Sequence, residues 1–337
     1  MTSPKTKVVV VGGGTGTYTL LRGLREYHNR IDIAAIVTMA DSGGSTGRLR
    51  DAFGQLPVGD VRQALSALAP DVPGAPNLLR DLFLYRFQTG EGLAGHNFGN
   101  LFLTALTDML GSEALAIEAA ADLLRICGRV IPVTTDKVHL QAKFTSGRIV
   151  VGEHSIDEPD QDHQHDRIME LSLTPHARLS PEAKEVIHEA DVVVFGPGDF
   201  YTSILANTVV EGFADALAAS RAMVIFVANL MARPGQTIGM HLEDYLREFK
   251  RYVQTDPDIV IIPDAPLPTH LVRLYEAAEA VHPILYELGD TFKTVLHPAT
   301  IVSHQAVSVQ AGDVLARSFI RHDSAALAET IMALLHS

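Results

Sequence analysis

Four short stretches of this sequence combine glycines with hydroxyl, amide or charged side chains, which are the residue types that loops use to hold phosphate groups. They are Gly12, Gly13, Gly14, Thr15 and Gly16; Asp41, Gly43, Gly44, Ser45 and Arg48; His96, Asn97 and Asn100; and Gly196, Gly198, Thr202 and Ser203. Glycine lets the backbone approach a ligand closely, and the free N–H groups at a helix start attract anions. We therefore predict a binding site for a phosphorylated small molecule, against the alternative that these are only tight turns.

The first stretch is close to the dinucleotide-binding pattern G-x-G-x-x-G but does not match it. After Gly12 and Gly14 the pattern requires glycine at position 17, which is Thr17, and a start one residue later fails because position 15 is a threonine. Asp41 stands near the place where a Rossmann dehydrogenase carries an acidic residue. The broken pattern nevertheless counts against an NAD-dependent oxidoreductase.

The second stretch, DSGGSTGR, is followed by arginines that could bind a diphosphate. A guanidinium forms two parallel hydrogen bonds to phosphate, so Arg48, Arg50 and Arg62 are candidates. The alternatives are solvated side chains or salt bridges to Asp51 or Asp60. We also expect Asp60 to cap the helix that begins in PVGDVRQAL.

Histidines and asparagines leave further alternatives open. His96 could donate to a phosphate, act as a base or only fix a turn, and Asn97 and Asn100 share this ambiguity. His163 and His165 in DHQHDR could form a metal pair, but nothing nearby completes a ligand set, so we expect a solvated loop. The sequence lacks a GxSxG elbow, so a hydrolase triad is not predicted.

Apolar runs rich in β-branched residues alternate with amphipathic helical patterns along most of the chain. We predict strands within 7–11, 31–40, 192–198, 222–230 and 258–263, and helices within 17–27, 99–110, 112–124 and 211–220. Strands that are apolar on both faces and separated by helices are typical of a mostly parallel, Rossmann-like α/β sheet with helices on both faces.

Two segments depart from this alternation. Residues 137–156 predict two antiparallel strands joined by a turn at TSG, followed by an acidic surface loop over 157–167. Residues 318–335 predict a strand, a polar turn and a closing helix capped by Ser324 or Asp323. We expect one Rossmann-like domain over 1–337, with a β-hairpin and polar loop inserted around 137–170.

Composition limits the kinds of partner. The 337 residues include 27 Lys and Arg against 40 Asp and Glu, a net charge of −13 that argues against a nucleic-acid-binding protein. One cysteine, Cys127, allows no disulfide framework and suits a buried position in a reducing compartment. No apolar run approaches the ~18–20 residues of a membrane span, and the N-terminus lacks a signal-peptide pattern, so we expect a cytoplasmic protein. Proteins of this class commonly form homodimers.

Taken in chain order, several motifs resemble those of one family. GGGTG, DSGGSTGRLRD, PVGDVRQAL, GHNFGN, GPGDFYTSI, NLMARPGQT and FIRHD are similar to motifs of the YvcK proteins, known as gluconeogenesis factors, in a superfamily with the 2-phospho-L-lactate transferase CofD. The resemblance runs from Val8 to about Leu335. It implies a Rossmann-like fold, a site for a UDP-sugar, chiefly UDP-N-acetylglucosamine, and a link to cell shape, peptidoglycan precursor supply and growth on gluconeogenic carbon.

The resemblance also extends the expected ligand-binding set. It adds Asn229, Tyr275 and Arg321 to the loop residues given above. The family usually carries two aspartates in a DDGGS loop, whereas Ser42 replaces the second aspartate here. In CofD-like transferases an acidic residue of this loop helps to hold magnesium, so Asp41 alone weakens the case for metal-assisted transfer.

The leading hypothesis is a UDP-sugar-binding regulatory protein without catalytic residues, read by a protein partner in cell-wall or carbon-metabolism control. The alternative is a CofD-like, magnesium-dependent transferase of a phospho-group from a nucleotide donor, with Asp41 as metal ligand. Only this alternative calls for a cofactor, which is Mg²⁺.

Overall fold

Seven parallel strands form the central sheet of the protein, in the spatial order β10-β9-β8-β7-β1-β2-β3. A computed structural model describes residues 4–71, 77–279, 281–289, 292–303 and 320–335. The strands are β1 (Thr6–Gly12), β2 (Ile31–Val37), β3 (Arg129–Pro132), β7 (Val192–Phe195), β8 (Met223–Val227), β9 (Ile259–Pro263) and β10 (Val295–Ala299). The predicted Rossmann-like parallel sheet is confirmed, and β3 and β10 are two edge strands that the prediction did not include.

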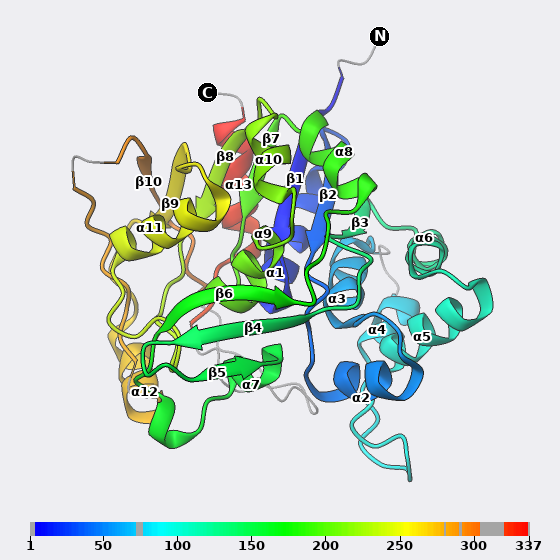
Figure 1. Ribbon diagram of the computed structural model, residues 1–337. Coiled ribbons are helices and arrows are strands. Elements are labelled where there is room, and N and C mark those ends of the chain that lie inside the picture. Colours follow the sequence, from blue (N-terminus) through cyan, green and yellow to red (C-terminus); the bar gives the residue numbers. More distant parts are fainter. Residues whose placement is uncertain (1–3, 72–76, 280, 290–291, 304–319, 336–337) are drawn as a thin grey trace.

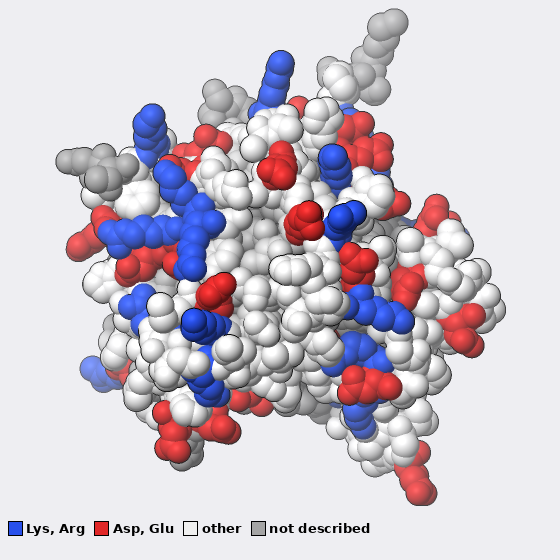
Figure 2. All heavy atoms as spheres, viewed as in Figure 1, with Lys and Arg blue, Asp and Glu red and all other residues white. Residues whose placement is uncertain are grey.

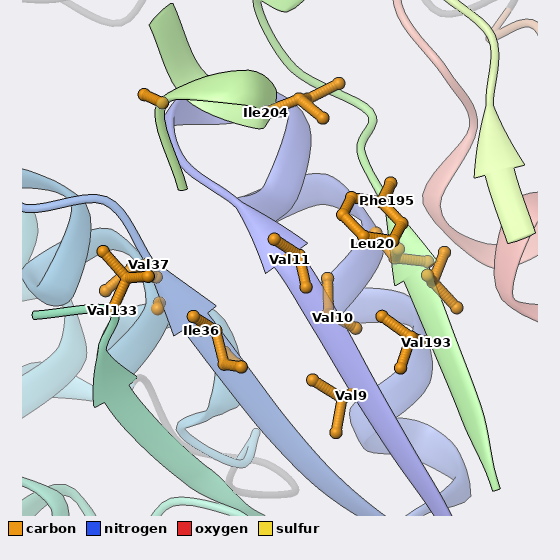
Figure 3. Close-up of a cluster of buried hydrophobic side chains, with 14 of the residues drawn as sticks. Val9, Val10, Val11, Leu20, Ile36, Val37, Val133, Val193, Phe195 and Ile204 are labelled. Atoms are coloured by element: carbon orange, nitrogen blue, oxygen red, sulfur yellow. The ribbon is translucent and has the colours of Figure 1, made fainter. Parts of the chain in front are cut away.

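The central strands are buried on both faces, which explains their uninterrupted apolar sequences. Val8, Val9, Val10 and Val11 of β1 are all at most 2% exposed. Figure 3 shows side chains of β1, β2 and β7 packed around this strand, with Leu20 contributed by the first helix. Each such side chain stabilises the fold by about 1.5–3 kcal/mol when it leaves water.

Helices cover both faces of the sheet (Figure 1). One group comprises α1 (Gly14–Leu24), α3 (Gly59–Leu68) and α13 (Ser324–Leu334), and the other α8 (Pro181–Glu189), α10 (Phe213–Ala218) and α11 (Leu242–Val253). The remaining helices are η1 (Arg25–Tyr27), α2 (Gly44–Phe53), α4 (Leu78–Leu84), α5 (Phe98–Leu110), α6 (Glu113–Leu124), α7 (Glu153–Asp157), η2 (Gln161–His163), η3 (Phe200–Leu205), α9 (Ala206–Thr208) and α12 (Thr269–Glu279).

A small antiparallel sheet is inserted between β3 and β7. Its order is β5-β4-β6, with β4 (His139–Phe144), β5 (Ile149–Val151) and β6 (Ile168–Thr174). The turn between β4 and β5 lies at Thr145–Gly147, as the TSG motif predicts, while β6 was not predicted. Figure 1 shows this sheet below β1 and β2, with α7 on its lower side.

The C-terminal segment returns to the first helix. Asp323 is the N-cap of α13 and accepts a hydrogen bond from the Ala326 N–H at 2.9 Å, so of the two predicted caps it is the aspartate that acts. Ser324 instead donates to the Thr19 carbonyl on α1 at 2.7 Å. The predicted strand begins at residues 318 and 319, which lie outside the described residues, and His322 pairs with Val302 in a single bridge.

No helix in the described part of the chain is long and apolar enough to cross a membrane.

Candidate ligand site at the sheet edge

The loops that follow β1 and β7 meet at the point where the strand order reverses. The chain proceeds from β1 outward to β2 and β3, and later returns to place β7 on the other side of β1. In open α/β sheets the carboxyl ends of the strands at such a switch point form the ligand crevice. Three of the four glycine-containing stretches follow β1, β2 and β7 directly, so the topology brings them to this edge.

The glycine loop after β1 packs tightly against the loop after β7. A Cβ on Gly16 would lie 2.4 Å from the Pro197 carbonyl oxygen, so only glycine allows this approach. Thr17, which breaks the dinucleotide pattern, donates from Oγ1 to the same carbonyl at 3.3 Å. Gly13 is the N-cap of α1 and has no side chain of its own to cap the first turn, where Thr15 lies. The loop is therefore fixed by backbone contacts and opens on a helix N-terminus.

Asp60 organises this loop from a neighbouring helix. Its Oδ1 accepts a hydrogen bond from the Gly14 N–H at 2.8 Å, and a Cβ on Gly13 would collide with its Oδ2. The prediction that Asp60 caps α3 is wrong, because Val58 is the N-cap and Asp60 lies inside the first turn. Burial, together with the nearby charge of Asp41, raises the pKa of Asp60 to about 7.

The loop after β2 is closed by its own aspartate. Asp41 Oδ1 accepts from the Gly43 N–H at 2.8 Å, and a Cβ on Gly59 would lie 2.0 Å from Asp41 Oδ2. Gly43 is the N-cap of α2 without a side-chain cap, and Gly44 has a φ of +43° that favours glycine. Burial raises the pKa of Asp41, although hydrogen bonds from Gly43 and Thr46 act in the opposite direction.

The GHNFGN stretch supports the β2 loop and does not form a separate open loop. Ser45 Oγ lies 3.2 Å from His96 Nδ1 and accepts from the Asn97 N–H at 3.1 Å. Asn97 is the N-cap of α5, where its side chain accepts from the Asn100 N–H at 3.3 Å. Asn100 donates to Thr46 Oγ1 at 3.2 Å. His96 and both asparagines are at most 8% exposed, which favours the turn-fixing alternative for all three.

The three candidate arginines all have protein partners. Arg48 donates to the Ala94 carbonyl at 3.2 and 3.3 Å, and Arg50 pairs with Asp51, which was one of the alternatives given above. Arg62 is buried and donates from Nε to Asn100 Oδ1 at 2.9 Å, and burial lowers its pKa to about 10. These contacts hold the loops together and engage all three arginines within the protein.

The loop after β7 faces the β1 loop. Gly196 has a φ of +79°, and a Cβ on Gly14 would meet Ser203 Oγ at 3.5 Å. Asn229, just after β8, donates to the Gly198 carbonyl at 2.7 Å. Thr202 donates from Oγ1 to Asp157 Oδ1 at 2.8 Å, which ties this loop to helix α7 of the insertion.

The residues taken from the family resemblance lie near the end of β8. Tyr275 is 7% exposed and packs in a small apolar cluster with Leu230 and Ile320, the residues next to Asn229 and Arg321 in the chain. The Arg321 carbonyl accepts from the Ser303 N–H at 2.8 Å. The structure thus brings Asn229, Tyr275 and Arg321 to one region beside the β7 loop.

Charged side chains on the visible face form pairs. Figure 2 shows lysines and arginines gathered over α11, where Arg247, Lys250 and Arg251 each lie within 4 Å of a carboxylate. Among the described residues, no three His, Cys, Asp or Glu side chains are arranged to hold a metal ion. His163 and His165 lie on and beside η2 in the polar segment before β6.

Comparisons with known proteins identify relatives of the whole chain. The sequence pattern of the 2-phospho-L-lactate transferase CofD family matches residues 8–299. The gluconeogenesis factor of Bacillus subtilis is 35% identical over 333 residues, which are 98% of each protein. A gluconeogenesis factor homologue from Nostoc sp. is 46% identical over 242 residues. These residues make up 72% of this chain and 51% of the Nostoc protein. A crystal structure of a UPF0052 family protein from Bacillus halodurans superposes with a TM-score of 0.85 at 33% identity, covering 98% of this chain and 100% of that one.

Proposed function

The chain belongs to the CofD family and, within it, to the gluconeogenesis factors called YvcK proteins, and on this premise we propose that it binds a UDP-sugar as a regulatory ligand. The observation that carries the proposal is the pair of helix N-termini, α1 and α2, whose N-cap residues Gly13 and Gly43 have no side chain to cap the first turn. A diphosphate suits such N–H groups and positive dipole ends. The ligand we expect is UDP-N-acetylglucosamine.

The remaining site residues take supporting roles in this proposal. Thr15, Gly16 and Ser45 lie in the first turns of α1 and α2, and Ser203 faces the same loops from β7. Asn229, Tyr275 and Arg321 would contact the nucleoside or the sugar. Binding would order the loops, and a protein partner in cell-wall or carbon-metabolism control would recognise that state in the cytoplasm.

The first experiment is a thermal-shift panel of UDP-N-acetylglucosamine, UDP-glucose, UDP, GDP and NAD, with and without magnesium. A ligand at ~100 times its dissociation constant stabilises by about 2.7 kcal/mol, which for a chain of 337 residues is a shift of about 4 °C. We expect a shift with UDP-sugars that does not require the metal. No shift with any UDP-sugar would contradict the proposal.

Arg321→Gln provides a site variant, with Arg221→Gln as the matched control because Arg221 is exposed and precedes β8, at the opposite end of that strand from Asn229. We expect at least tenfold weaker UDP-N-acetylglucosamine binding in the first and unchanged binding in the second. Chromatography of the nucleotide after long incubation tests the regulatory role, since steady conversion to UDP would make the protein an enzyme.

The alternative function is a CofD-like transfer of a phospho-group with magnesium. It is favoured by the carboxyl groups of Asp41 and Asp60, which lie close enough for the charge of one to raise the pKa of the other. Asp41 already accepts from the Gly43 N–H, so a magnesium ion would need phosphate oxygens and water as its further ligands. A GDP shift that requires magnesium and disappears in Asp41→Asn would support this function.

A further inference from the structure

Helix α7, in the insertion, makes direct contacts with the loop after β2. The Ser42 N–H donates to Glu153 Oε2 at 3.3 Å, and the His154 N–H donates to Ser42 Oγ at 3.0 Å. A Cβ on Gly43 would lie 3.7 Å from His154 Nδ1 and 3.9 Å from Glu153 Oε2. The first turn of α7 is therefore seated on the DSGG loop, at the position where the related family usually has a second aspartate.

The other end of α7 contacts two further loops. Asp157 Oδ1 accepts hydrogen bonds from Thr202 Oγ1 at 2.8 Å and from Gln236 Nε2 at 2.7 Å. Thr202 belongs to the loop after β7, and Gln236 lies in the NLMARPGQT segment after β8. Both residues are 1% exposed, so these bonds are sheltered from water. One short helix thus joins the loops that follow β2, β7 and β8.

Glu153 and Asp157 are the first and last residues of α7, four residues apart, so their carboxyl groups are neighbours on one face of the helix. Two carboxyl groups can share a hydrogen bond only while one of them carries a proton. Asp157 already accepts hydrogen bonds from Thr202 and Gln236, so the proton of a bond between the two carboxyl groups belongs to Glu153. Burial and the charges of Asp157 and Asp41 raise the pKa of Glu153 well above its usual value.

We infer that α7 is a proton-dependent latch that holds the loops after β2, β7 and β8 in fixed positions relative to one another, with Glu153 and Asp157 as its positioning residues. While Glu153 is protonated, it accepts from the Ser42 N–H and donates to Asp157, so the latch is closed. When Glu153 ionises, two carboxylates one turn apart repel each other, and the loops after β2 and β7 lose their common anchor.

Other charged groups on the elements around α7 set the direction of this response. The acidic ones are Asp41, Asp60, Asp199 and Glu158, and the basic or titratable ones are Arg62, Arg233, His154, His139, Lys143 and Tyr201. Arg233 lies 3.9 Å from Asp199, and Arg62 hydrogen-bonds to Asn100. The carboxylates around the pair favour the protonated, closed latch.

Hydrogen exchange tests the latch without any ligand. The probes are the amides of residues 41–46 and 199–205 in the full chain at pH 6 and pH 9, with rates corrected for the intrinsic dependence on pH. Glu153→Gln keeps the acceptor for Ser42 and adds an amide donor for Asp157 that cannot ionise. Glu153→Ala removes both contacts, and Asp162→Asn is the matched control because it removes one exposed carboxylate from the same insertion.

We expect the protection of both loops against hydrogen exchange to fall at least tenfold between pH 6 and pH 9, in the wild type and in Asp162→Asn alike. Protection should stay high at both pH values in Glu153→Gln and low at both in Glu153→Ala. Equal wild-type protection at the two pH values would overturn the latch, and so would a fall in Glu153→Gln as large as that of the wild type.

A second measurement rests on the proposed function. UDP-N-acetylglucosamine affinity should fall between pH 6 and pH 9 in the wild type and stay constant in Glu153→Gln. If neither protein binds this ligand, the proposed ligand is wrong while the exchange result still decides the latch. If both bind it with the same pH dependence, the latch does not control the site.

Discussion

Replacing Asp60 by asparagine is expected to stabilise the protein at neutral pH. The asparagine side chain keeps an oxygen that can accept from the Gly14 N–H, as Asp60 Oδ1 does at 2.8 Å. It also removes the Asp60 carboxyl, in a residue that is only 9% exposed. Burial and the nearby charge of Asp41 raise the pKa of this carboxyl from 3.8 to about 7. Between these two values the folded protein binds a proton that the unfolded chain has released, so the free energy of unfolding falls as the pH rises.

The size of this effect follows from the two pKa values. The loss is about 1.4 kcal/mol for each pH unit between 3.8 and about 7, or ~4 kcal/mol in all, as an upper limit. The unfolding entropy of a 337-residue chain converts this to about 6 °C at most. Asp60→Asn should therefore melt several degrees above the wild type at pH 8 and at nearly the same temperature at pH 4.

Thermal unfolding of both proteins from pH 4 to pH 9, followed by circular dichroism, provides the measurement. Asp51→Asn is the matched control, since the Asp51 side chain is 74% exposed and should change the curve little. If Asp60→Asn were less stable than the wild type at every pH, the carboxylate would be a stabilising charge, paired with Arg62. That result would refute the view that burial dominates at this position.

Three further perturbations test other parts of the structure. Gly16→Ala places a Cβ 2.4 Å from the Pro197 carbonyl oxygen, so we expect a loss of about 1–3 kcal/mol by urea unfolding and loss of UDP-sugar binding; unchanged stability would mean that the two loops are not in contact. His322 donates toward the Ala228 carbonyl at 3.2 Å, and its removal from water lowers its pKa from 6.5 to about 4. The wild type should lose about 3 kcal/mol through this group as the pH falls from 6.5 to 4, and His322→Gln should lack that loss in an acid titration. Ser42→Asp brings a carboxylate beside Glu153 and should lower the melting temperature more at pH 8 than at pH 5, whereas an equal change at both pH values would place the new charge in water.

The central strands could be predicted because the residues that they bury form continuous apolar runs in the sequence. The runs that become β1, β2, β7, β8 and β9 are apolar on both faces, as strands inside a parallel sheet must be. β10, with the sequence VLHPA, is an edge strand whose residues are half-buried or exposed. Its mixed polarity gives no signal, so pairing with β9 alone defines it.

The meeting of the glycine loops could also be predicted, because the carboxyl ends of parallel strands share one edge. The role of Asp60 could not. Its position near a helix start is a strong local capping signal, but its contact with Gly14 depends on how α3 packs against α1. Glu153 and Asp157 gave no signal either, since an acidic pair in a polar segment is usually solvated, and only the fold of the insertion brings it to the loops.

The carboxyl groups at this edge bear on how an anionic ligand could bind there. Asp41, Asp60 and Glu153 would repel a diphosphate if all were ionised, yet burial raises the pKa of each, so the site can hold protons in place of charge. The usual second aspartate of the family's loop is Ser42 here, and Glu153 of α7 supplies a carboxyl to its backbone. A protonated Asp41 or Asp60 offers a phosphate a hydrogen-bond donor, whereas a carboxylate at either position requires a cation. Proton uptake on UDP-sugar binding, measured by calorimetry in buffers of different ionisation enthalpy, would separate these two arrangements.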